Sequence, residues 1–363
     1  MTDITRESIE TQLKSYIEPC LGQDLVSAGA IKDIQIKGAD VDLTLSLGFP
    51  AEGYHEILTR ALQDELSAIS GIGNVSIQIE TNITSHSVQK GVQTLSGIKN
   101  TIAIASGKGG VGKSTTSVNL ALALQAEGAR VGILDADIYG PSQPRMLGCS
   151  GKPDSADGKT IEPKLSYNIQ SMSMGYLIDE ETPMIWRGPM VTGALEQLLS
   201  DTNWKDLDYL IIDLPPGTGD IQLTLCQKIP VSAAIIVTTP QDIALLDARK
   251  AHNMFKKVSV PVLGIIENMS THICSQCGHE EHIFGSGGGE QMSKQYDIDL
   301  LGSLPLDIRI REGVDEGKPT VAIEPDSDIS LLYREIARKS SARLSQMAKD
   351  YSGKFPKIVI ESN

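Results

Sequence analysis

The chain has 363 residues, of which 40% are hydrophobic and 21% charged, and its formal net charge is −14. Such an acidic balance repels nucleic acids and anionic membranes unless a local basic cluster overrides it, and the sequence contains no dense cluster of Lys and Arg. No apolar run approaches the ~20 residues that a membrane-spanning helix needs, and residues 1–6 lack a signal-peptide pattern. We therefore expect a cytoplasmic protein of two or three domains that binds neither nucleic acid nor membrane.

Residues 1–83 are expected to form a small α+β domain. Apolar residues recur at helical spacing over 9–17 and 58–66, which predicts two amphipathic helices. Apolar and polar residues alternate over 34–47, around a Lys-Gly-Ala-Asp turn, and again over 75–79, which predicts a hairpin and a third strand. The order helix, hairpin, helix, strand indicates one compact unit.

Residues 84–97 contain small polar residues without periodicity and are interpreted as a linker. From 98 to 350, short apolar strands alternate with helices, and most of these strands end in a polar residue. This pattern predicts an α/β fold with a doubly wound, mostly parallel sheet, with its chemistry at the carboxyl edge of the strands. The expected strands are 102–105, 130–134, 209–212, 233–237, 262–266 and 300–304. A last helix is expected over 329–347, followed by a C-terminal tail at 351–363.

The first of these strands leads into a phosphate-binding loop. A glycine-rich turn follows the apolar run, and Lys113-Ser114-Thr115 then opens a helix, which is the context that such a loop requires. The glycines let backbone N–H groups face the phosphates, and the helix N-terminus attracts negative charge. Lys113 is expected to reach the outer phosphates of ATP and Ser114 to bind Mg²⁺. The nucleotide-binding residues are expected to be Gly107, Lys108, Gly109, Gly110, Val111, Gly112, Lys113, Ser114 and Thr115.

Polar residues at the ends of later strands complete the expected site. Asp213 ends one strand and begins the loop Asp-Leu-Pro-Pro-Gly-Thr-Gly-Asp, where a carboxylate can hold the Mg²⁺ shell. Asp135 is a second candidate for the outer shell of the metal, or a cap of its strand. Asn268 follows another strand and is a candidate for contact with the adenine edge.

The second lysine of the loop, Lys108, resembles a feature of the deviant phosphate-loop ATPases. That resemblance implies that Lys108 reaches across a dimer to the nucleotide of the partner subunit. It also implies that Asp137, in Leu-Asp-Ala-Asp-Ile-Tyr-Gly-Pro, orients the attacking water. Lys108, Lys113, Asp137 and Asp213 are therefore the candidate catalytic residues.

Five cysteines, an odd number, argue against a disulfide framework. Cys20, Cys149 and Cys226 are isolated and are interpreted as small apolar residues. Cys274 and Cys277 form a Cys-x-x-Cys pair that supplies half of a tetrahedral ligand set. Three completions are open: a second pair from a symmetric dimer, which we favour; a local zinc site with His279 and His282; or a redox pair.

The motifs in this order, ending with Cys-x-x-Cys after a Glu-Asn-Met-Ser strand end, resemble the Mrp-type iron–sulfur cluster carriers. Residues 18–33 also resemble part of a small domain associated with metal–sulfur cluster biogenesis. The resemblance implies an ATP-hydrolysing homodimer that holds a 4Fe–4S cluster on Cys274 and Cys277 and transfers it to apo iron–sulfur client proteins. A positioning or partition ATPase and a zinc-locked targeting ATPase are the alternatives.

Overall fold

The computed structural model describes residues 4–155, 158–178 and 188–349, and the expected tail at 351–363 lies outside these ranges. Its largest feature is an eight-stranded sheet with the order β15-β12-β11-β6-β10-β7-β9-β8. Neighbouring strands pair in parallel except β8 and β9, which are antiparallel. The strands are β6 (Ile98–Ala105), β7 (Val131–Asp135), β8 (Lys164–Ser166), β9 (Ile169–Ser173), β10 (Leu207–Asp213), β11 (Ala233–Thr238), β12 (Val262–Glu267) and β15 (Leu300–Ser303).

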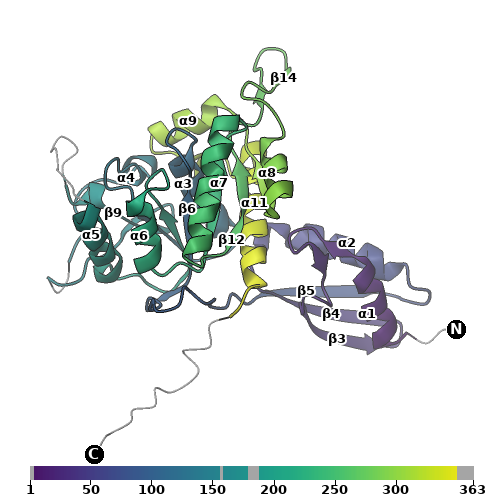
Figure 1. The fold of residues 1–363 in the computed structure, drawn as a ribbon. Coiled ribbons are helices and arrows are strands. Elements are labelled where there is room, and N and C mark those ends of the chain that lie inside the picture. The colour runs from purple at the N-terminus through teal and green to yellow at the C-terminus, as the bar shows by residue number, and fades with distance from the viewer. Residues whose placement is uncertain (1–3, 156–157, 179–187, 350–363) are drawn as a thin grey trace, which may run out of the picture.

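The central strands are apolar on both faces, so helices have to cover both. Ala103 and Ala105 of β6 belong to the hydrophobic cluster on one face. Ile102 and Ile104 belong to the cluster on the other face. Figure 1 shows helices on both sides of the sheet, which confirms the doubly wound fold. The first face is covered by α5 (Gly188–Asp201), α6 (Asp220–Lys228) and α7 (Asp242–Lys257), and the second by α3 (Lys113–Ala126) and α11 (Asp328–Ser345).

Shorter elements surround this core. A two-stranded hairpin projects beyond β12 and stands clear of the body (Figure 1). These elements are α4 (Gln143–Met146), β13 (His272–Ile273), β14 (Glu280–Glu281), α8 (Gly288–Tyr296), α9 (Ile308–Asp315) and α10 (Thr320–Ile323). Within the described ranges, no helix is both long enough and apolar enough to cross a membrane.

The N-terminal part has its own three-stranded sheet and its own hydrophobic core. β3 and β4 form the expected antiparallel hairpin, and β5 pairs with β4 in parallel after a helical crossover. The apolar faces of the two helices, which include Leu13 and Leu62, complete this core. The elements are α1 (Arg6–Ser15), β3 (Ile31–Lys37), β4 (Asp40–Leu47), α2 (His55–Ser67) and β5 (Val75–Thr81), with a short pair β1 (Ile17–Glu18) and β2 (Gln23–Asp24).

Residues 84–97, interpreted as a linker, contain no helix and no strand of the named sheets, but they pack against the larger sheet. Gln89 is buried, and its amide donates to the carbonyl oxygen of Cys226 and accepts from the N–H of Val231. His86 is also buried and contacts the Asn100 side chain. The first half of this segment is therefore held in place by specific contacts, whereas most of residues 90–97 are exposed.

Candidate functional site

The phosphate loop lies between β6 and α3, as the sequence predicts. Gly110 and Gly112 have φ angles of 81° and 80°, a conformation that side chains with a Cβ adopt rarely. A Cβ on Gly112 would lie 2.2 Å from Asn268 Nδ2, and one on Gly107 would lie 2.1 Å from the backbone of Asp247. The absence of a Cβ at Gly107 and at Gly112 thus allows the phosphate loop to pack closely against Asp247 and Asn268.

Lys113 is buried and binds Asp213, with its Nζ atom 2.6 Å from Oδ1. The same ammonium group donates to Ser114 Oγ at 3.1 Å. The positively charged Lys113 ammonium group therefore lies between Ser114 and Asp213, the two side chains that the sequence predicts to bind Mg²⁺. Hydroxyl and carboxylate oxygens are the ligands that Mg²⁺ prefers, so this donor set fits the metal.

The carboxylate of Asp213 has two more partners, which the sequence did not reveal. Ser117 Oγ donates to Oδ1 at 2.8 Å, and Gln143 Nε2 donates to Oδ2 at 2.9 Å. Gln143 is fully buried at the start of α4 and also donates to the carbonyl oxygen of Ser114. The only signal in the sequence was its position soon after Asp137, the residue that the resemblance assigns to the attacking water.

Asp135 supports the segment from Asp137 to α4. Its carboxylate accepts hydrogen bonds from the backbone N–H groups of Asp137, Ser142 and Gln143, and from Ser173 Oγ. Burial, followed by the charge of Asp213, raises the pKa of Asp135 to about 7. Of its two expected roles, these contacts match the cap.

Asp137 lies beside the phosphate loop. Burial raises the pKa of its carboxyl, and the positive charge of Lys113 acts in the opposite direction. Lys108 is half-buried, and its carbonyl oxygen accepts a hydrogen bond from Ser106 Oγ. Asn268 is buried, and its amide donates to the carbonyl oxygen of Val111 at 2.9 Å. This amide thus supports the phosphate loop, while its contact with adenine stays a prediction.

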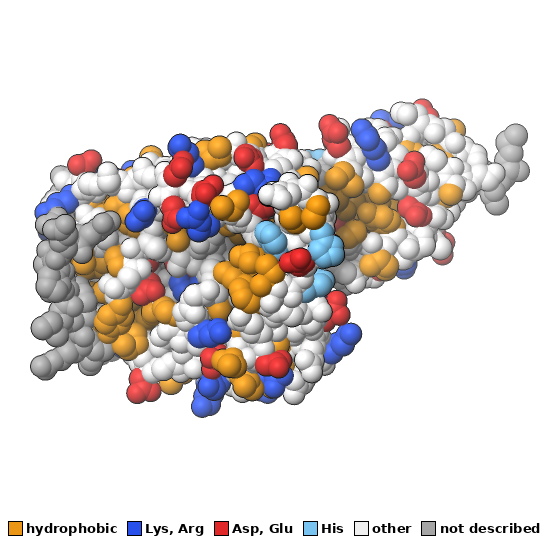
Figure 2. Space-filling view, turned by 90° about the horizontal axis from the view of Figure 1, so that it is seen from above, with side chains coloured by type: hydrophobic (Ala, Val, Ile, Leu, Met, Phe, Trp, Pro, Cys, Tyr) orange, Lys and Arg blue, Asp and Glu red, His pale blue; other side chains and the backbone are white. Residues whose placement is uncertain are grey.

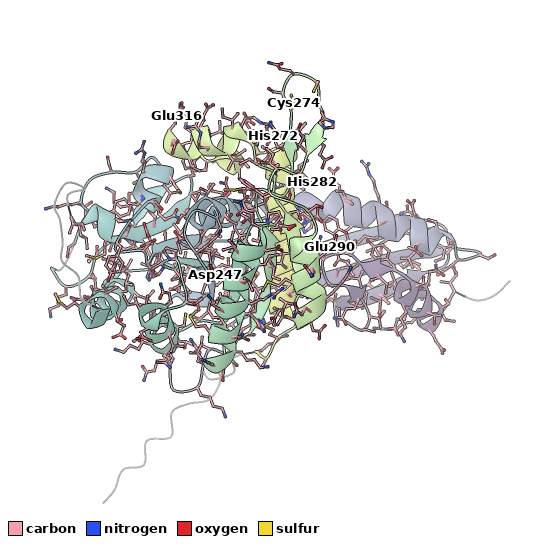
Figure 3. All side chains as sticks on the ribbon, turned by 45° about the horizontal axis from the view of Figure 1, so that its top comes forward. Asp247, His272, Cys274, His282, Glu290 and Glu316 are labelled. Carbon is pink, nitrogen blue, oxygen red and sulfur yellow. The ribbon has the colours of Figure 1, made fainter. Side chains whose placement is uncertain are left out.

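Cys274 and Cys277 lie in the turn that connects β13 and β14, and Cys274 is near the outer end of this hairpin (Figure 3). The N–H of Cys274 donates to the carbonyl oxygen of His279, and the N–H of Gly278 donates to the carbonyl oxygen of Cys274, which closes the turn. Cys277 is exposed and Cys274 half-exposed. Backbone hydrogen bonds from Gln276 and Cys277 lower the pKa of the Cys274 thiol, which favours the thiolate that binds metals.

The two histidines near this pair have other partners. His282 Nδ1 lies 3.0 Å from the carbonyl oxygen of Ser270, and His282 lies nearer the base of the hairpin than Cys274 (Figure 3). His279 is exposed beside Glu281. Within the described ranges, no three His, Cys, Asp or Glu side chains gather closely enough to hold a metal ion.

Two of the three other cysteines are buried, as expected for small apolar residues. Cys20 and Cys226 are buried, and burial raises the pKa of each thiol to about 12. Cys149 is partly buried and packs against the hydrophobic core.

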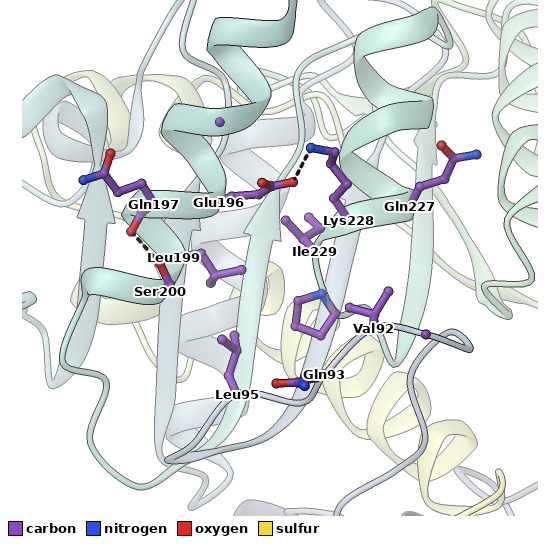
Figure 4. A pocket seen from close by; sticks show the side chains of 13 residues that line it. Val92, Gln93, Leu95, Glu196, Gln197, Leu199, Ser200, Gln227, Lys228 and Ile229 are labelled. Carbon is purple, nitrogen blue, oxygen red and sulfur yellow. Dashed lines mark hydrogen bonds and ion pairs between the residues drawn. The ribbon is translucent and has the colours of Figure 1, made fainter.

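An open pocket of about 670 Å³ lies at the amino ends of the strands of the large sheet, opposite the end that carries the phosphate loop (Figure 4). Residues 91–95, α5 and the end of α6 line it, and Lys228 bridges to Glu196 at 3.0 Å. These residues lie at the amino ends of β6 and β11. Because the expected chemistry lies at the carboxyl ends, this pocket is separate from the nucleotide site.

Comparison with known proteins supports the fold and the motifs. A family model described as NUBPL iron-transfer P-loop NTPase matches residues 97–341, and one described as iron–sulfur cluster assembly protein matches residues 6–79. An iron–sulfur cluster carrier protein of Pseudomonas fragi is 56% identical over 285 residues, covering 78% of this chain and 99% of the relative. The iron–sulfur cluster carrier protein of Escherichia coli K12 is 48% identical over 340 residues, covering 93% of this chain and 92% of the relative.

Among solved structures, a nucleotide-binding protein from Archaeoglobus fulgidus in complex with ADP aligns with a TM-score of 0.55 and 36% identity. The alignment covers 64% of this chain and 90% of that protein. The first family match spans more than half of the chain, and the relatives match over nearly their whole length. These matches confirm the resemblance inferred from the motifs. The chain belongs to the family of NUBPL iron-transfer P-loop NTPases.

Proposed function

We propose that this protein hydrolyses ATP and carries a 4Fe–4S cluster, held between two copies of the chain, to apo iron–sulfur proteins. One observation carries the proposal: Cys277, which is exposed, and Cys274, which is half-exposed, lie on a hairpin that extends from the same sheet edge as the phosphate loop. Only β11 separates β12, which leads to the hairpin, from β6, which leads to the loop. The printed names of the relatives, iron–sulfur cluster carrier protein, support the cargo.

At the nucleotide site, Ser114 and Asp213 would hold Mg²⁺, which when bound neutralises phosphate charge and polarises the phosphoryl group. The Lys113 ammonium then leaves Asp213 and contacts the outer phosphates. The Asp137 carboxylate accepts a hydrogen bond from the attacking water and orients it. Lys108 of the partner subunit supplies a further positive charge to the same phosphates, and the backbone N–H groups of the loop bind them from below.

At the cysteine site, each chain supplies two thiolates, whereas a 4Fe–4S cluster needs four ligands. A two-fold axis through the hairpin tips brings identical pairs together and completes the set. Ile273 and Ile283 lie close to the cysteines in sequence, and each is more than half exposed. Figure 2, which views the hairpin side, shows hydrophobic side chains gathered beside histidines. Such a surface is suited to burial against a second copy.

The free cysteines are consistent with one cell compartment in particular. All five cysteines are free thiols, which suits the reducing conditions of the cytoplasm, where we place the protein.

The net charge of −14 disfavours the alternative of a partition ATPase on DNA or membrane. A zinc-locked targeting ATPase would use the same cysteines, so the test has to identify the metal.

The test is anaerobic reconstitution of the full chain with iron and sulfide, followed by visible absorption, metal and sulfide analysis, and analytical ultracentrifugation. We expect one 4Fe–4S cluster per two chains, present in the dimer alone. Cys274→Ala and Cys277→Ala are each expected to lose the cluster, because the two thiolates that remain in such a dimer bind it weakly at an exposed interface. Cys149→Ala is the matched control and is expected to retain it. Zinc without sulfide, or a full cluster in each monomer, would contradict the proposal.

A further inference from the structure

Gln143 is a buried polar residue of the nucleotide site to which the proposed mechanism gives no role. It is fully buried, and its backbone N–H donates to Asp135 Oδ2 at 3.0 Å. Its side chain reaches the opposite side of the site, where Nε2 donates to Asp213 Oδ2 at 2.9 Å and to the carbonyl oxygen of Ser114 at 3.1 Å. Gln143 therefore connects the segment after Asp137 to the groups proposed for Mg²⁺.

The orientation of the amide follows from these contacts. A rotated amide would place Oε1 against a carboxylate and a carbonyl oxygen, which are both acceptors and would repel it. With Nε2 fixed in this way, Oε1 is buried and has no hydrogen-bond partner within the part of the chain that the structure describes. The neighbouring Ser142 Oγ is also buried without a partner there. Buried acceptors are rarely left unpaired in folded proteins, so a donor is expected to bind Oε1 in the working state.

Water bound to Mg²⁺ is the donor that fits this position. Mg²⁺ dehydrates reluctantly and keeps several waters when one or two protein oxygens bind it. Gln143 Nε2 contacts both Asp213 and the backbone of Ser114, so the two residues proposed to bind the metal lie next to this amide. A metal-bound water is a strong donor, and the unpaired Oε1 atom is the acceptor available to it.

We propose that Gln143 is a positioning residue for the nucleotide-bound Mg²⁺: Nε2 holds Asp213 in place, and Oε1 accepts a hydrogen bond from a metal-bound water. The inference rests on the proposed MgATP site. In this role Gln143 connects the segment from Asp137 to α4 with the shell of the metal. Its side chain faces the metal shell, and its backbone N–H, like that of Asp137, donates to the Asp135 carboxylate.

The test measures metal affinity and does not depend on turnover. Mn²⁺ is titrated into the full-length, ADP-saturated protein and the free ion is followed by electron paramagnetic resonance. Gln143→Leu keeps the approximate volume and removes both amide contacts; we expect it to weaken Mn²⁺ binding by about tenfold or more, the usual effect of losing a partner of a metal ligand. ADP affinity in excess EDTA is expected to stay within about twofold, since the amide contacts no phosphate in the proposal.

Two further variants make the result specific. Gln143→Glu keeps an oxygen acceptor but loses the donor to Asp213 and sets a second carboxylate against it, so we expect a Mn²⁺ affinity between those of the parent and Gln143→Leu. A role limited to holding Asp213 would make Glu as damaging as Leu. Gln170→Leu is the matched control, because Gln170 lies on β9 and its amide donates to Lys205. Unchanged Mn²⁺ affinity in Gln143→Leu, or equal losses in both Gln143 variants, would overturn the proposal. If the parent shows no ADP-dependent Mn²⁺ binding, the MgATP site itself is wrong.

Discussion

Cys226 shows how burial sets the properties of a single residue. Its side chain lies on α6 with no exposed surface, and this burial raises the pKa of the thiol from 9.0 to about 12. The unfolded chain releases the thiol proton above pH 9, whereas the folded chain keeps it until about pH 12. Unfolding therefore releases a proton in this window, so the free energy of unfolding falls as pH rises from 9 towards 12. Below pH 9 this thiol contributes no pH dependence.

We expect Cys226→Ala to reduce the alkaline loss of stability by up to about 1 kcal/mol per pH unit between pH 9.5 and 11. The measurement is the urea midpoint at several pH values, and the quantity compared is the slope, because the smaller side chain also lowers stability at every pH. Cys149→Ala, a partly exposed cysteine, serves as the control for a general effect of removing a thiol. Identical slopes for the parent and Cys226→Ala would show that the thiol is not held protonated by the fold.

The sequence predicted some residues of the nucleotide site and not others for a physical reason. Asp213 is the last residue of β10, and parallel strands bring their carboxyl ends to one edge. Lys113 lies eight residues beyond β6, but the glycine-rich motif between the strand and α3 fixes the path of those residues. Their place in one site was therefore expected from the sequence, whereas the direct contact between Lys113 and Asp213 was not. Gln143 is eight residues beyond the end of β7, on the short helix α4, and the path of that segment is set by the contacts of Asp135. No local pattern encodes such a path.

At the scale of elements, α3 links the phosphate loop to the N-terminal part. The helix begins at Lys113 and ends before Glu127, whose side chain is fully buried. Its carboxylate accepts hydrogen bonds from Arg334 Nε at 2.8 Å, from Arg338 Nη1 at 2.6 Å, and from the N–H of Gly53 at 3.1 Å. Glu127 thus joins three segments that are far apart in the sequence.

We expect Glu127→Ala to lower the free energy of unfolding by about 3 kcal/mol, because it leaves two largely buried guanidinium groups, whose side chains are 13% exposed, without their carboxylate. Glu335→Ala is the matched control, since the bridge between Glu335 and Lys339 on α11 is largely exposed and is worth about 0.5 kcal/mol. Urea unfolding followed by circular dichroism measures both. An equal effect of the two substitutions would mean that the Glu127 cluster contributes no more than a surface pair.

The elements that the sequence predicted are those with a strong period or a long apolar run. The helices α1, α2 and α11 and the central strands of the large sheet match their expected positions within a few residues. The antiparallel pair of the edge strand β8 and its neighbour β9 was missed because these strands have three and five residues and include several polar ones. The hairpin around Cys274 and Cys277 was also missed, because each of its strands has two residues and the turn, not the side-chain pattern, defines it.

At the scale of the whole molecule, the carboxyl edge of the large sheet collects the proposed chemistry. The phosphate loop, Asp137, Asp213 and Asn268 follow the ends of β6, β7, β10 and β12, and the cysteine hairpin extends β12 beyond the same edge. A dimer that meets through this edge brings both nucleotide sites and both cysteine pairs to one axis. This arrangement offers a physical route by which occupancy of the nucleotide site can alter the geometry of the cysteine pairs.

The proposed role of Lys108 tests this dimer directly. Within the described ranges, its side chain has no hydrogen bond or ion pair, unlike Lys113, whose ammonium is bound to Asp213. If Lys108 acts on the partner's nucleotide, Lys108→Ala and Lys113→Ala are each expected to lose ATP hydrolysis as homodimers. In a mixed dimer, the subunit carrying Lys108→Ala keeps its own Lys113 and receives Lys108 from the partner, so one complete site forms.

Random exchange of equal amounts of the two variants yields about half mixed dimers, each with one of two sites complete, and hydrolysis is expected to return to about a quarter of the parent rate per chain. Mass-tagged subunits analysed by native mass spectrometry measure the extent of exchange, and phosphate release measures the rate. Mixing Lys113→Ala with Asp213→Ala is the control, because both residues act within their own subunit and every site in that mixed dimer stays defective. Demonstrated exchange without recovered hydrolysis would assign Lys108 to its own subunit's site and remove the main reason to place the two phosphate loops face to face.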